Sequence, residues 1–376
     1  MHWIVVGAGA AGCAVTAELV ARPDNDVTLL EAGPTVVPPG VRSPSFFDAL
    51  AEPGWTFPGG VRRGRGLGGS SAVNGMVAGR GWAGDMPIET VTDDELGPLG
   101  QALLAAAPDA APVRLMRRDG TRVTAADHFL SPLPAGRVAL RGDATVGAVS
   151  LAGHRAVGVV LADGTELAAD RVVLCAGAIG TPAILLRSGI TAGGVGEGLR
   201  NHAGLPVVLR RRGDVDEHSL VIGSGWRRRD VDVLALEHLG PDEPEWGMLL
   251  AVLMTTSSTG RVTLDAADGA AEPLVEWSLD PSDRARLARA GLRAAGLAEH
   301  PAFATVVDEV VVGEGPAGVF HWASTCAIGR VLDERGAVAG HDHLYVADAA
   351  AFAEIPVEHL LVPTIAQARR LARRFV

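Results

Sequence analysis

The sequence is poor in cysteine. It contains three, Cys13, Cys175 and Cys326, in 376 residues, and no two of them lie close together. A disulfide framework or a cysteine-ligated zinc site needs more cysteines at shorter spacings, so we predict neither, and no other metal site. Cys13 opens a predicted helix and Cys175 ends a predicted strand. Both positions are typical of small core residues.

Long apolar runs and an excess of positive charge are also missing. No apolar stretch approaches the roughly 20 residues that span a bilayer, so we expect no membrane span. Acidic residues, 44 in all, outnumber the 33 basic ones and give a formal net charge of −11. That balance argues against a nucleic acid or an anionic membrane surface as a partner.

Neither an internal repeat nor a low-complexity linker divides the chain. A chain of this length can bury two cores, so two modules would have to be interleaved in sequence. The predicted fold begins at residue 3, which leaves no room for a signal peptide. We therefore expect a cytoplasmic protein.

The N-terminal residues combine the features of a dinucleotide-binding unit. An apolar run leads into Gly7-Ala8-Gly9-Ala10-Ala11-Gly12, and a second apolar run ends at Glu31. Glycines at these positions permit a tight turn, close approach of a pyrophosphate and close packing of a helix. The helix N-terminus offers N–H groups to the diphosphate, and Glu31 has the spacing of an acid that binds a ribose hydroxyl. We predict a bound adenine dinucleotide.

Strands dominate the predicted elements further along the chain, and helices follow their usual start signals. These elements are a hairpin over 156–168, a buried strand over 171–176, a helix over 183–187 with Pro182 just inside its start, a β-rich stretch over 205–277, a helix over 283–299, a strand over 343–347 and a last helix over 363–374.

A second glycine-rich segment covers residues 63–75, with the sequence RGRGLGGSSAVNG. It brings five glycines, two serine hydroxyls and an asparagine amide into a short span. Such a segment suits a backbone pressed against a flat polar ligand.

The chain resembles the glucose–methanol–choline (GMC) family of FAD-dependent oxidoreductases, because six separated blocks match the family in order and spacing. The blocks are the N-terminal fingerprint through Glu31-Ala32-Gly33-Pro34, residues 68–75, residues 176–182, residues 194–199 with Asn201-His202, His321 with Ser324-Thr325-Cys326, and Val346-Ala347-Asp348-Ala349 leading to Ile355-Pro356 and Pro363-Thr364.

The resemblance implies an α/β fold in which a Rossmann-like FAD-binding domain is interleaved with a smaller α+β substrate domain built on an antiparallel sheet. The FAD-binding domain would comprise residues 1–82, 128–203 and 313–376. Residues 83–127 would form the lid region and 204–312 the substrate-binding domain. Both segments are short for the family, which leaves the flavin more open. We therefore expect a bulky, macromolecular or protein-bound alcohol over a small one.

The resemblance also implies the FAD contacts, residue by residue. Gly7, Gly9 and Gly12 would hold the diphosphate, Glu31 the adenosine ribose and Val146 the adenine. Gly68, Gly69, Ser70, Asn74 and Gly75 would lie along the ribityl chain and isoalloxazine, and Asp348 near the ribityl–diphosphate side. The helix starting at Pro363-Thr364 would aim its N-terminus at the flavin pyrimidine, where reduced flavin is negative. Further expected contacts are Ala10, Ala11, Ala32, Arg65, Ala176, Gly177 and Ala349. Val73 stands where some members link FAD covalently through histidine, so FAD should be non-covalent.

Alcohol oxidation in this family requires a base that removes the hydroxyl proton while hydride passes to flavin N5. Histidine stays neutral near pH 7, and His321 matches the family's catalytic histidine. The family places a second histidine or asparagine at the position of Leu361. His359, two residues earlier, is the candidate replacement, either reaching the flavin or pointing to solvent.

Two other classes of flavoprotein are alternatives to an alcohol-oxidising enzyme. A disulfide-type flavoenzyme would need a second glycine fingerprint and a cysteine pair, and the sequence has neither. A GMC-like flavoprotein without simple alcohol oxidation, either a lyase or a redox partner of a peptide-derived cofactor of the mycofactocin kind, is favoured by Leu361 and the short lid. The electron acceptor is unknown, and we expect a dehydrogenase because no peroxide-handling or secretory context is visible.

Overall fold

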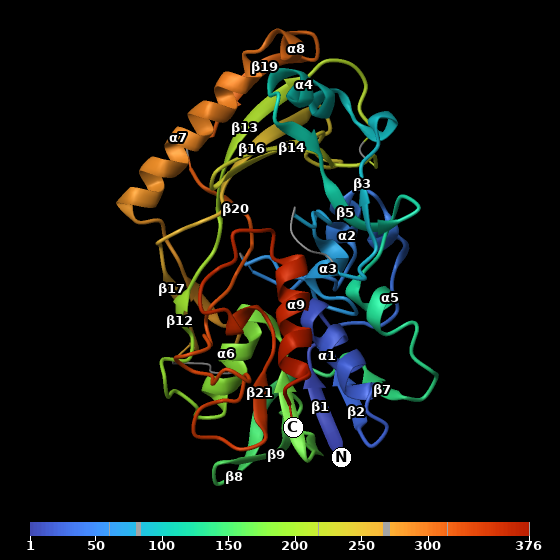
Figure 1. Ribbon diagram of the computed structural model, residues 1–376, viewed down its shortest axis with the longest axis vertical. Helices are drawn as coiled ribbons and strands as arrows, with labels where there is room; N and C mark the ends of the chain where they lie inside the picture. The colour runs from blue at the N-terminus through green and yellow to red at the C-terminus, as the bar shows by residue number, and fades with distance from the viewer. Residues whose placement is uncertain (60, 80–83, 217, 266–270, 314, 376) are drawn as a thin grey trace.

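The computed structural model describes residues 1–59, 61–79, 84–216, 218–265, 271–313 and 315–375. Figure 1 shows two halves, and both chain termini lie at the far end of the lower one. The predicted boundary between the first FAD-binding segment and the lid, at residues 82 and 83, lies outside the described residues.

The lower half is built on a parallel sheet in the order β21-β11-β1-β2-β7, in which every neighbouring pair runs parallel. Helices flank this sheet, and α9 lies beside α1 with its first turn at the end nearer the upper half (Figure 1). The strand, helix, strand order predicted at the N-terminus is confirmed. The elements are β1 (His2–Val6), α1 (Ala10–Val20), β2 (Asp26–Leu30), β7 (Val138–Arg141), β11 (Arg171–Leu174), α6 (Gly177–Arg187), β21 (Leu344–Val346) and α9 (Leu361–Ala372).

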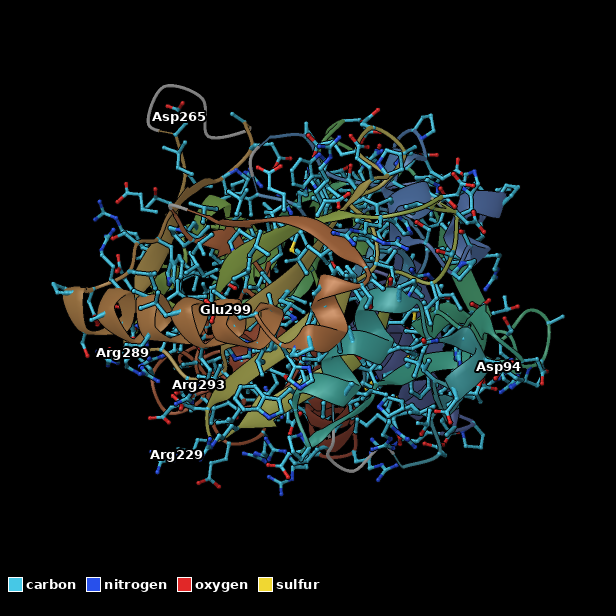
Figure 2. All side chains as sticks on the ribbon, turned by 90° about the horizontal axis from the view of Figure 1, so that it is seen from above. Asp94, Arg229, Asp265, Arg289, Arg293 and Glu299 are labelled. Atoms are coloured by element: carbon cyan, nitrogen blue, oxygen red, sulfur yellow. The ribbon has the colours of Figure 1, made fainter. Side chains whose placement is uncertain are left out.

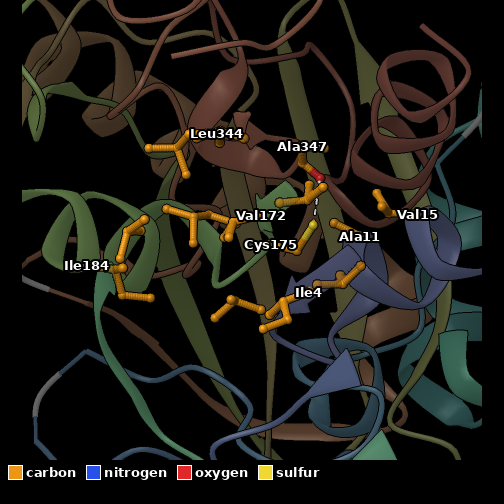
Figure 3. Packing of buried hydrophobic residues seen from close by; sticks show 14 of the residues in the cluster. Ile4, Ala11, Val15, Val172, Cys175, Ile184, Leu344 and Ala347 are labelled. Carbon is orange, nitrogen blue, oxygen red and sulfur yellow. Dashed lines mark hydrogen bonds between the residues drawn. The ribbon is translucent and has the colours of Figure 1, made fainter. Parts of the chain in front are cut away.

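Side chains from three adjacent strands and from α1 form the core of this half. Figure 3 shows Ile4, Val172 and Leu344 beside Ala11 and Val15, and each of these residues is buried. Strands covered by helices on both faces are largely apolar, and β1 and β11 are apolar after their first residues, His2 and Arg171. The strands run toward the upper half, so their carboxyl ends, where ligands bind in such sheets, face the junction between the halves (Figure 1).

The cysteines belong to this packing. Sγ of Cys13 donates to the carbonyl of Ala8 at 3.2 Å, and Sγ of Cys175 donates to that of Ala347 at 3.5 Å (Figure 3). Burial raises the pKa of both thiols, so they stay protonated. The prediction that both are core residues is confirmed.

The upper half is built on an antiparallel sheet in the order β19-β13-β16-β15-β14-β4, with β20 also pairing with β13. Helix α7 lies across this sheet, with Arg289 and Arg293 on its solvent side (Figure 2). The predicted helix over 283–299 and the β-rich stretch before it are confirmed. The elements are α4 (Pro98–Ala106), β4 (Ala110–Pro112), β13 (Ala203–Arg211), β14 (Ile222–Arg228), β15 (Val231–Leu236), β16 (Trp246–Leu253), α7 (Pro281–Ala298), α8 (Pro301–Ala304), β19 (Val307–Val312) and β20 (Ala317–Gly318).

Alternation along β15 divides its side chains between the two faces of the antiparallel sheet. Val233 and Ala235 pack into the cluster that contains the buried face of α7, whereas Leu234 and Leu236 pack into a different cluster that includes Met76 and Val77. Asp232 has the same parity as Leu234 and Leu236. Its carboxylate is therefore directed toward the junction between the halves.

Short sheets and helices complete the fold. The hairpin predicted over 156–168 is confirmed as β9 and β10, which extend β8 into a three-stranded sheet. These elements are η1 (Pro39–Arg42), α2 (Phe46–Ala51), α3 (Ser70–Val73), β3 (Ile88–Thr90), η2 (Asp93–Glu95), β5 (Arg114–Arg118), β6 (Thr121–Arg122), α5 (Ala125–Phe129), β8 (Val146–Ala152), β9 (Arg155–Leu161), β10 (Glu166–Ala168), β12 (Glu197–Leu199), β17 (Gly260–Thr263), β18 (Leu274–Glu276) and η3 (Ala349–Ala351).

Two predicted helix starts are wrong. Helix α6 begins at Gly177, so Pro182 lies inside the helix rather than at its start. The carbonyl of Ala178, which loses its i+4 partner at the proline, accepts a hydrogen bond from the Thr325 hydroxyl at 2.7 Å instead. Helix α9 begins at Leu361 rather than at Pro363, which places the proline in its first turn.

Within the part of the chain that the structure describes, every helix is too short or too polar to cross a membrane.

Candidate active site

The two glycine-rich segments, almost 60 residues apart in sequence, touch in the structure. The N–H of Gly68 donates to the carbonyl of Ala8 at 2.8 Å. A Cβ placed on Gly69 would lie 2.7 Å from the Cα of Gly9, and Gly69 has a φ of +51°. A side chain at Gly69 would therefore separate the segments.

Glu31 holds these segments together. Its carboxylate accepts backbone N–H groups of Ala8 at 2.8 Å, Gly33 at 2.9 Å and Gly66 at 2.8 Å. Burial raises the pKa of Glu31, while the three N–H groups oppose that rise. The predicted ribose acid therefore also fixes the relative position of the two glycine segments.

The N-terminus of α1 presents unpaired backbone donors beside this contact. Gly9 is the N-cap residue of α1, and among the described residues no side chain accepts a hydrogen bond from this end of the helix. The first-turn N–H groups of a helix lack intrahelical partners and favour an anion. A Cβ on Gly12 would lie 1.8 Å from the carbonyl oxygen of Gly7, so only glycine fits there.

Arg122, which sequence reasoning did not single out, orients Asn74. Its Nη1 donates to the Asn74 carbonyl at 2.7 Å and to Oδ1 at 3.0 Å, and Oδ1 also accepts the N–H of Met76 at 3.0 Å. Burial lowers the pKa of Arg122 to about 9, which still leaves it charged at neutral pH. With Oδ1 engaged, the Nδ2 of Asn74 is the group available to a ligand.

Asp348 joins the last strand of the parallel sheet to the start of α6. Its carboxylate accepts the N–H of Gly177 at 2.7 Å and the hydroxyl of Thr181 at 2.6 Å. Burial raises the pKa of Asp348 to about 6, and its hydrogen bonds act in the opposite direction. The expected contacts Ala176 and Ala349, each adjacent to one of these partners, are thereby brought together.

The remaining expected contacts lie around the same junction. Arg65 donates to the carbonyl of Ala32 at 2.7 Å. Val146 opens β8 and is buried, and Pro363 and Thr364 lie in the first turn of α9. Ser70 opens α3, its Oγ accepting the N–H of Gly64 at 3.1 Å, Ala10 and Ala11 open α1, and Gly75 follows Asn74.

These residues fit FAD. An uncapped helix N-terminus suits the diphosphate, glycines with no room for a Cβ allow close approach of the dinucleotide, and the free amide of Asn74 suits a polar ring edge. Val73, at the covalent-attachment position of some relatives, has no nucleophilic atom.

Three histidines meet where the two halves join. Nδ1 of His202 lies 2.8 Å from Nδ1 of His321, and the rings of His321 and His359 lie edge to face with centroids 5.3 Å apart. Burial, followed by the neighbouring His202 and His359, holds the pKa of His321 well below its usual value. His321 is therefore a neutral imidazole at pH 7, as a base requires.

His359 points neither to solvent nor away from His321. It is buried, and its Nε2 lies 3.1 Å from Oδ2 of Asp232 on β15. Leu361 lies instead in an apolar cluster beneath α9. The structure therefore brings His359, and not the residue at position 361, to His321.

Residues of the antiparallel sheet hold the loop that carries His359. Arg227 forms an ion pair with Glu358 at 2.8 Å and also donates to the carbonyl of Val357. His202 lies 3.1 Å from the carbonyl of Pro356. The loop is thus attached at the histidine and at the three residues before it.

Three members of this cluster were missed by sequence reasoning as site residues: His202, Asp232 and Asn201, whose Oδ1 accepts the N–H of His321 at 2.8 Å. Asn201 and His202 stood in one of the family-like blocks but had no assigned role. Asp232 interrupts an otherwise apolar strand, residues 231–236, and that interruption was the available signal.

Within the described part of the chain, no group of three or more His, Cys, Asp or Glu side chains is arranged to hold a metal ion.

A Rossmann-like sheet with an FAD-fitting cradle, facing a histidine cluster, defines a flavin-dependent oxidoreductase. The chain belongs to the glucose–methanol–choline family: two models described as GMC oxidoreductase match residues 108–204 and 256–368. The cofactor is FAD, and the predicted fold class is confirmed.

The chain is 28% identical to an uncharacterized GMC-type oxidoreductase in the thcA 5′ region of Rhodococcus erythropolis, with 94% of each chain covered. It is 29% identical to 5-(hydroxymethyl)furfural oxidase of Methylovorus sp. (strain MP688), with 98% of this chain and 97% of that one covered. These alignments extend over 465 and 524 positions, more than the 376 residues of this chain, so the relatives contain segments with no counterpart here.

The fold matches the crystal structure of pyridoxine 4-oxidase from Mesorbium loti with a TM-score of 0.87 and 22% identity. The match covers 100% of this chain and 99% of the other.

Proposed function

We propose that this protein oxidises the CH–OH group of an alcohol, with His321 as the base that removes the hydroxyl proton. The observation that supports this proposal is a half-buried histidine with a lowered pKa, carried by a segment that is hydrogen-bonded to Ala349 and Ala178. Two relatives are named as oxidases of hydroxymethylfurfural and pyridoxine, which supports the substrate class.

The segment that carries His321 is tied to the cofactor loops. The N–H of Ser324 donates to the carbonyl of Ala349 at 3.0 Å, and the Thr325 hydroxyl donates to that of Ala178. Both acceptors adjoin the residues joined by Asp348. When bound, FAD supplies the oxidant that accepts hydride. The chain's part is to hold the base at a set position beside that cofactor.

We further propose that His359 takes the role of the polar residue that the family has at position 361. Oδ2 of Asp232 is a carboxyl oxygen and accepts, so the Nε2–H of His359 donates to it and Nδ1 is directed elsewhere. This hydrogen bond holds the His359 ring in one orientation beside His321.

The proposal is tested by mixing the FAD-loaded protein anaerobically with a panel of small and bulky alcohols. We expect loss of the visible flavin absorbance with at least one alcohol, and faster loss with the bulky ones because the lid region is short. No bleaching by any alcohol would overturn the proposal in favour of the lyase or the partner of a peptide-derived cofactor. Faster bleaching by small alcohols would overturn only the substrate-size prediction.

The same reduced protein tests the electron acceptor. We predict a dehydrogenase, so reoxidation by a quinone or dye should outpace reoxidation by air-saturated buffer, with little peroxide formed. Stoichiometric peroxide and fast reoxidation by O₂ would make the protein an oxidase, as two of its relatives are named.

Removing the acceptor of His359 should slow the reaction. A hydrogen bond to a charged group contributes about 1.5–3 kcal/mol, so Asp232→Ala should lower kcat by roughly 10- to 100-fold if that energy is expressed in the transition state. Asp232→Asn, which keeps an acceptor oxygen of the same reach, is the matched control and should lose less. Equal rates in both variants and wild type would show that the pair has no part in turnover.

A further inference from the structure

We propose that His202 is a positioning residue that fixes His321 in the tautomer whose Nε2 is unprotonated. The inference rests on the proposed function, because it concerns the base of that reaction. His202 is fully buried, and both of its ring nitrogens lie within hydrogen-bond distance of a partner.

The tautomer of His202 follows from its partner on the loop. A carbonyl oxygen only accepts, so the Nε2 of His202, 3.1 Å from the oxygen of Pro356, must carry a proton. The opposite tautomer would bring two lone pairs together at that contact. Burial lowers the pKa of His202 to about 3, with His359 and Arg227 acting in the same direction and the backbone carbonyls of Pro356 and Met254 opposing it, so the ring is neutral. Its Nδ1 is therefore an acceptor.

The state of His321 follows from that of His202. The two Nδ1 atoms are 2.8 Å apart, and His202 can only accept there, so Nδ1 of His321 must donate. In a neutral imidazole a proton on Nδ1 leaves Nε2 with a free lone pair. Among the described residues, Nε2 of His321 has no hydrogen-bond partner, and the ring is half-buried rather than buried. Nε2 is the nitrogen that can take a proton from an alcohol.

The chain of hydrogen bonds ends at a carbonyl, which cannot take up a proton. His202 therefore does not conduct the proton away. It holds the ring of His321 in place before and after that ring is protonated, because Nδ1 donates in both states. The backbone N–H of His321 donates to Oδ1 of Asn201 at 2.8 Å, and this hydrogen bond fixes the backbone that carries the ring.

A neutral partner also differs from the carboxylate that orients the histidine of a catalytic triad. A carboxylate beside Nδ1 would attract positive charge and raise the pKa of His321. An imidazole orients the base without that charge, so His321 remains unprotonated at neutral pH.

The direct test is to record two-bond ¹H–¹⁵N spectra of wild-type holoprotein carrying ¹⁵N-histidine, which distinguish protonated from unprotonated ring nitrogens. The signals of His321 and His202 are assigned from their loss in His321→Gln and His202→Asn. We expect Nδ1 protonated and Nε2 unprotonated for His321, and the reverse for His202. A His321 ring with its proton on Nε2 would overturn the inference.

The kinetic test compares two variants of His202. Asn places Oδ1 where Nδ1 stood and keeps the acceptor, whereas Leu has similar volume and no acceptor. We expect His202→Leu to lower kcat by roughly 10- to 100-fold, part of the 10²–10⁴ that a positioned base contributes, with KM little changed. His202→Asn should keep most of the wild-type kcat. Equal losses in the two variants, with FAD content and melting temperature unchanged, would overturn the positioning role.

The experiments distinguish a failure of the proposed function from a failure of the positioning role of His202. If no alcohol reduces the wild-type flavin, the proposed function fails, while the nitrogen spectra still report whether His202 fixes the tautomer. If alcohols reduce the flavin but His321 carries its proton on Nε2, the proposed function stands and the positioning role fails.

Discussion

Replacing His321 by glutamine is expected to lower kcat/KM for alcohol oxidation by about 10²–10⁴-fold, the contribution of a positioned general base. Glutamine cannot accept the hydroxyl proton at neutral pH, although it has similar size and can still hydrogen-bond His202. FAD should stay bound, because the cradle is formed by other residues. Stopped-flow flavin reduction measures the effect. His154→Gln, an exposed histidine at the β8–β9 turn, is the matched control and should reduce its flavin at the wild-type rate.

The pH profile of the wild type adds a second measurement. Since the pKa of His321 is held well below the ordinary 6.5, the ring is still unprotonated as the pH falls through that value. The plateau of kcat/KM should therefore extend below pH 6.5 and end on the acid side at the depressed pKa. An acid limb centred at or above 6.5, or wild-type activity in His321→Gln, would contradict His321 as the base.

Gly12→Ala is expected to abolish FAD binding. The new Cβ would lie 1.8 Å from the carbonyl oxygen of Gly7, so the glycine turn or α1 must move. Overpacking of this kind costs typically 1–3 kcal/mol of stability, and here the displaced backbone is the part that receives the diphosphate. The ratio of flavin to protein absorbance and the melting temperature measure both effects.

Gly296→Ala is the matched control for this substitution. Gly296 is exposed within α7, and nothing lies within 4 Å of its Cβ position. Alanine there should raise the stability by up to about 1 kcal/mol without changing FAD content. Full FAD content and unchanged melting in Gly12→Ala would show that the turn accommodates a side chain and that the cradle is not as close-packed as described.

The sequence pattern predicted the structure correctly where the contacts join residues that are close in sequence. The strand, glycine turn, helix and strand of residues 2–30 form one unit whose contacts lie within a short span, so spacing predicted it. Pattern was a poorer guide to Pro182, because the helix around it is completed by Thr325, about 140 residues away. No local signal contains that partner.

The same division holds for the active site. His321 was recognisable as a candidate base, but whether His359 would reach it depended on the path of a loop. That path is set by Arg227 and Asp232 of the antiparallel sheet and by His202, which directly precedes β13. Contacts between this loop and the antiparallel sheet bring His359 to His321, although His359 lies two residues before position 361. An offset in sequence therefore did not exclude His359 from the cluster.

By itself the sequence determined the dinucleotide unit, the family and FAD, because glycine spacing and an acid at a strand end act through short-range backbone geometry. Only the tertiary structure decided how the histidines are paired. His202 and His321 are 119 residues apart, and Asp232 and His359 are 127 apart. A hydrogen bond depends on position in space to within a few tenths of an ångström. Packing of the two halves against each other sets those positions, and residue order alone does not.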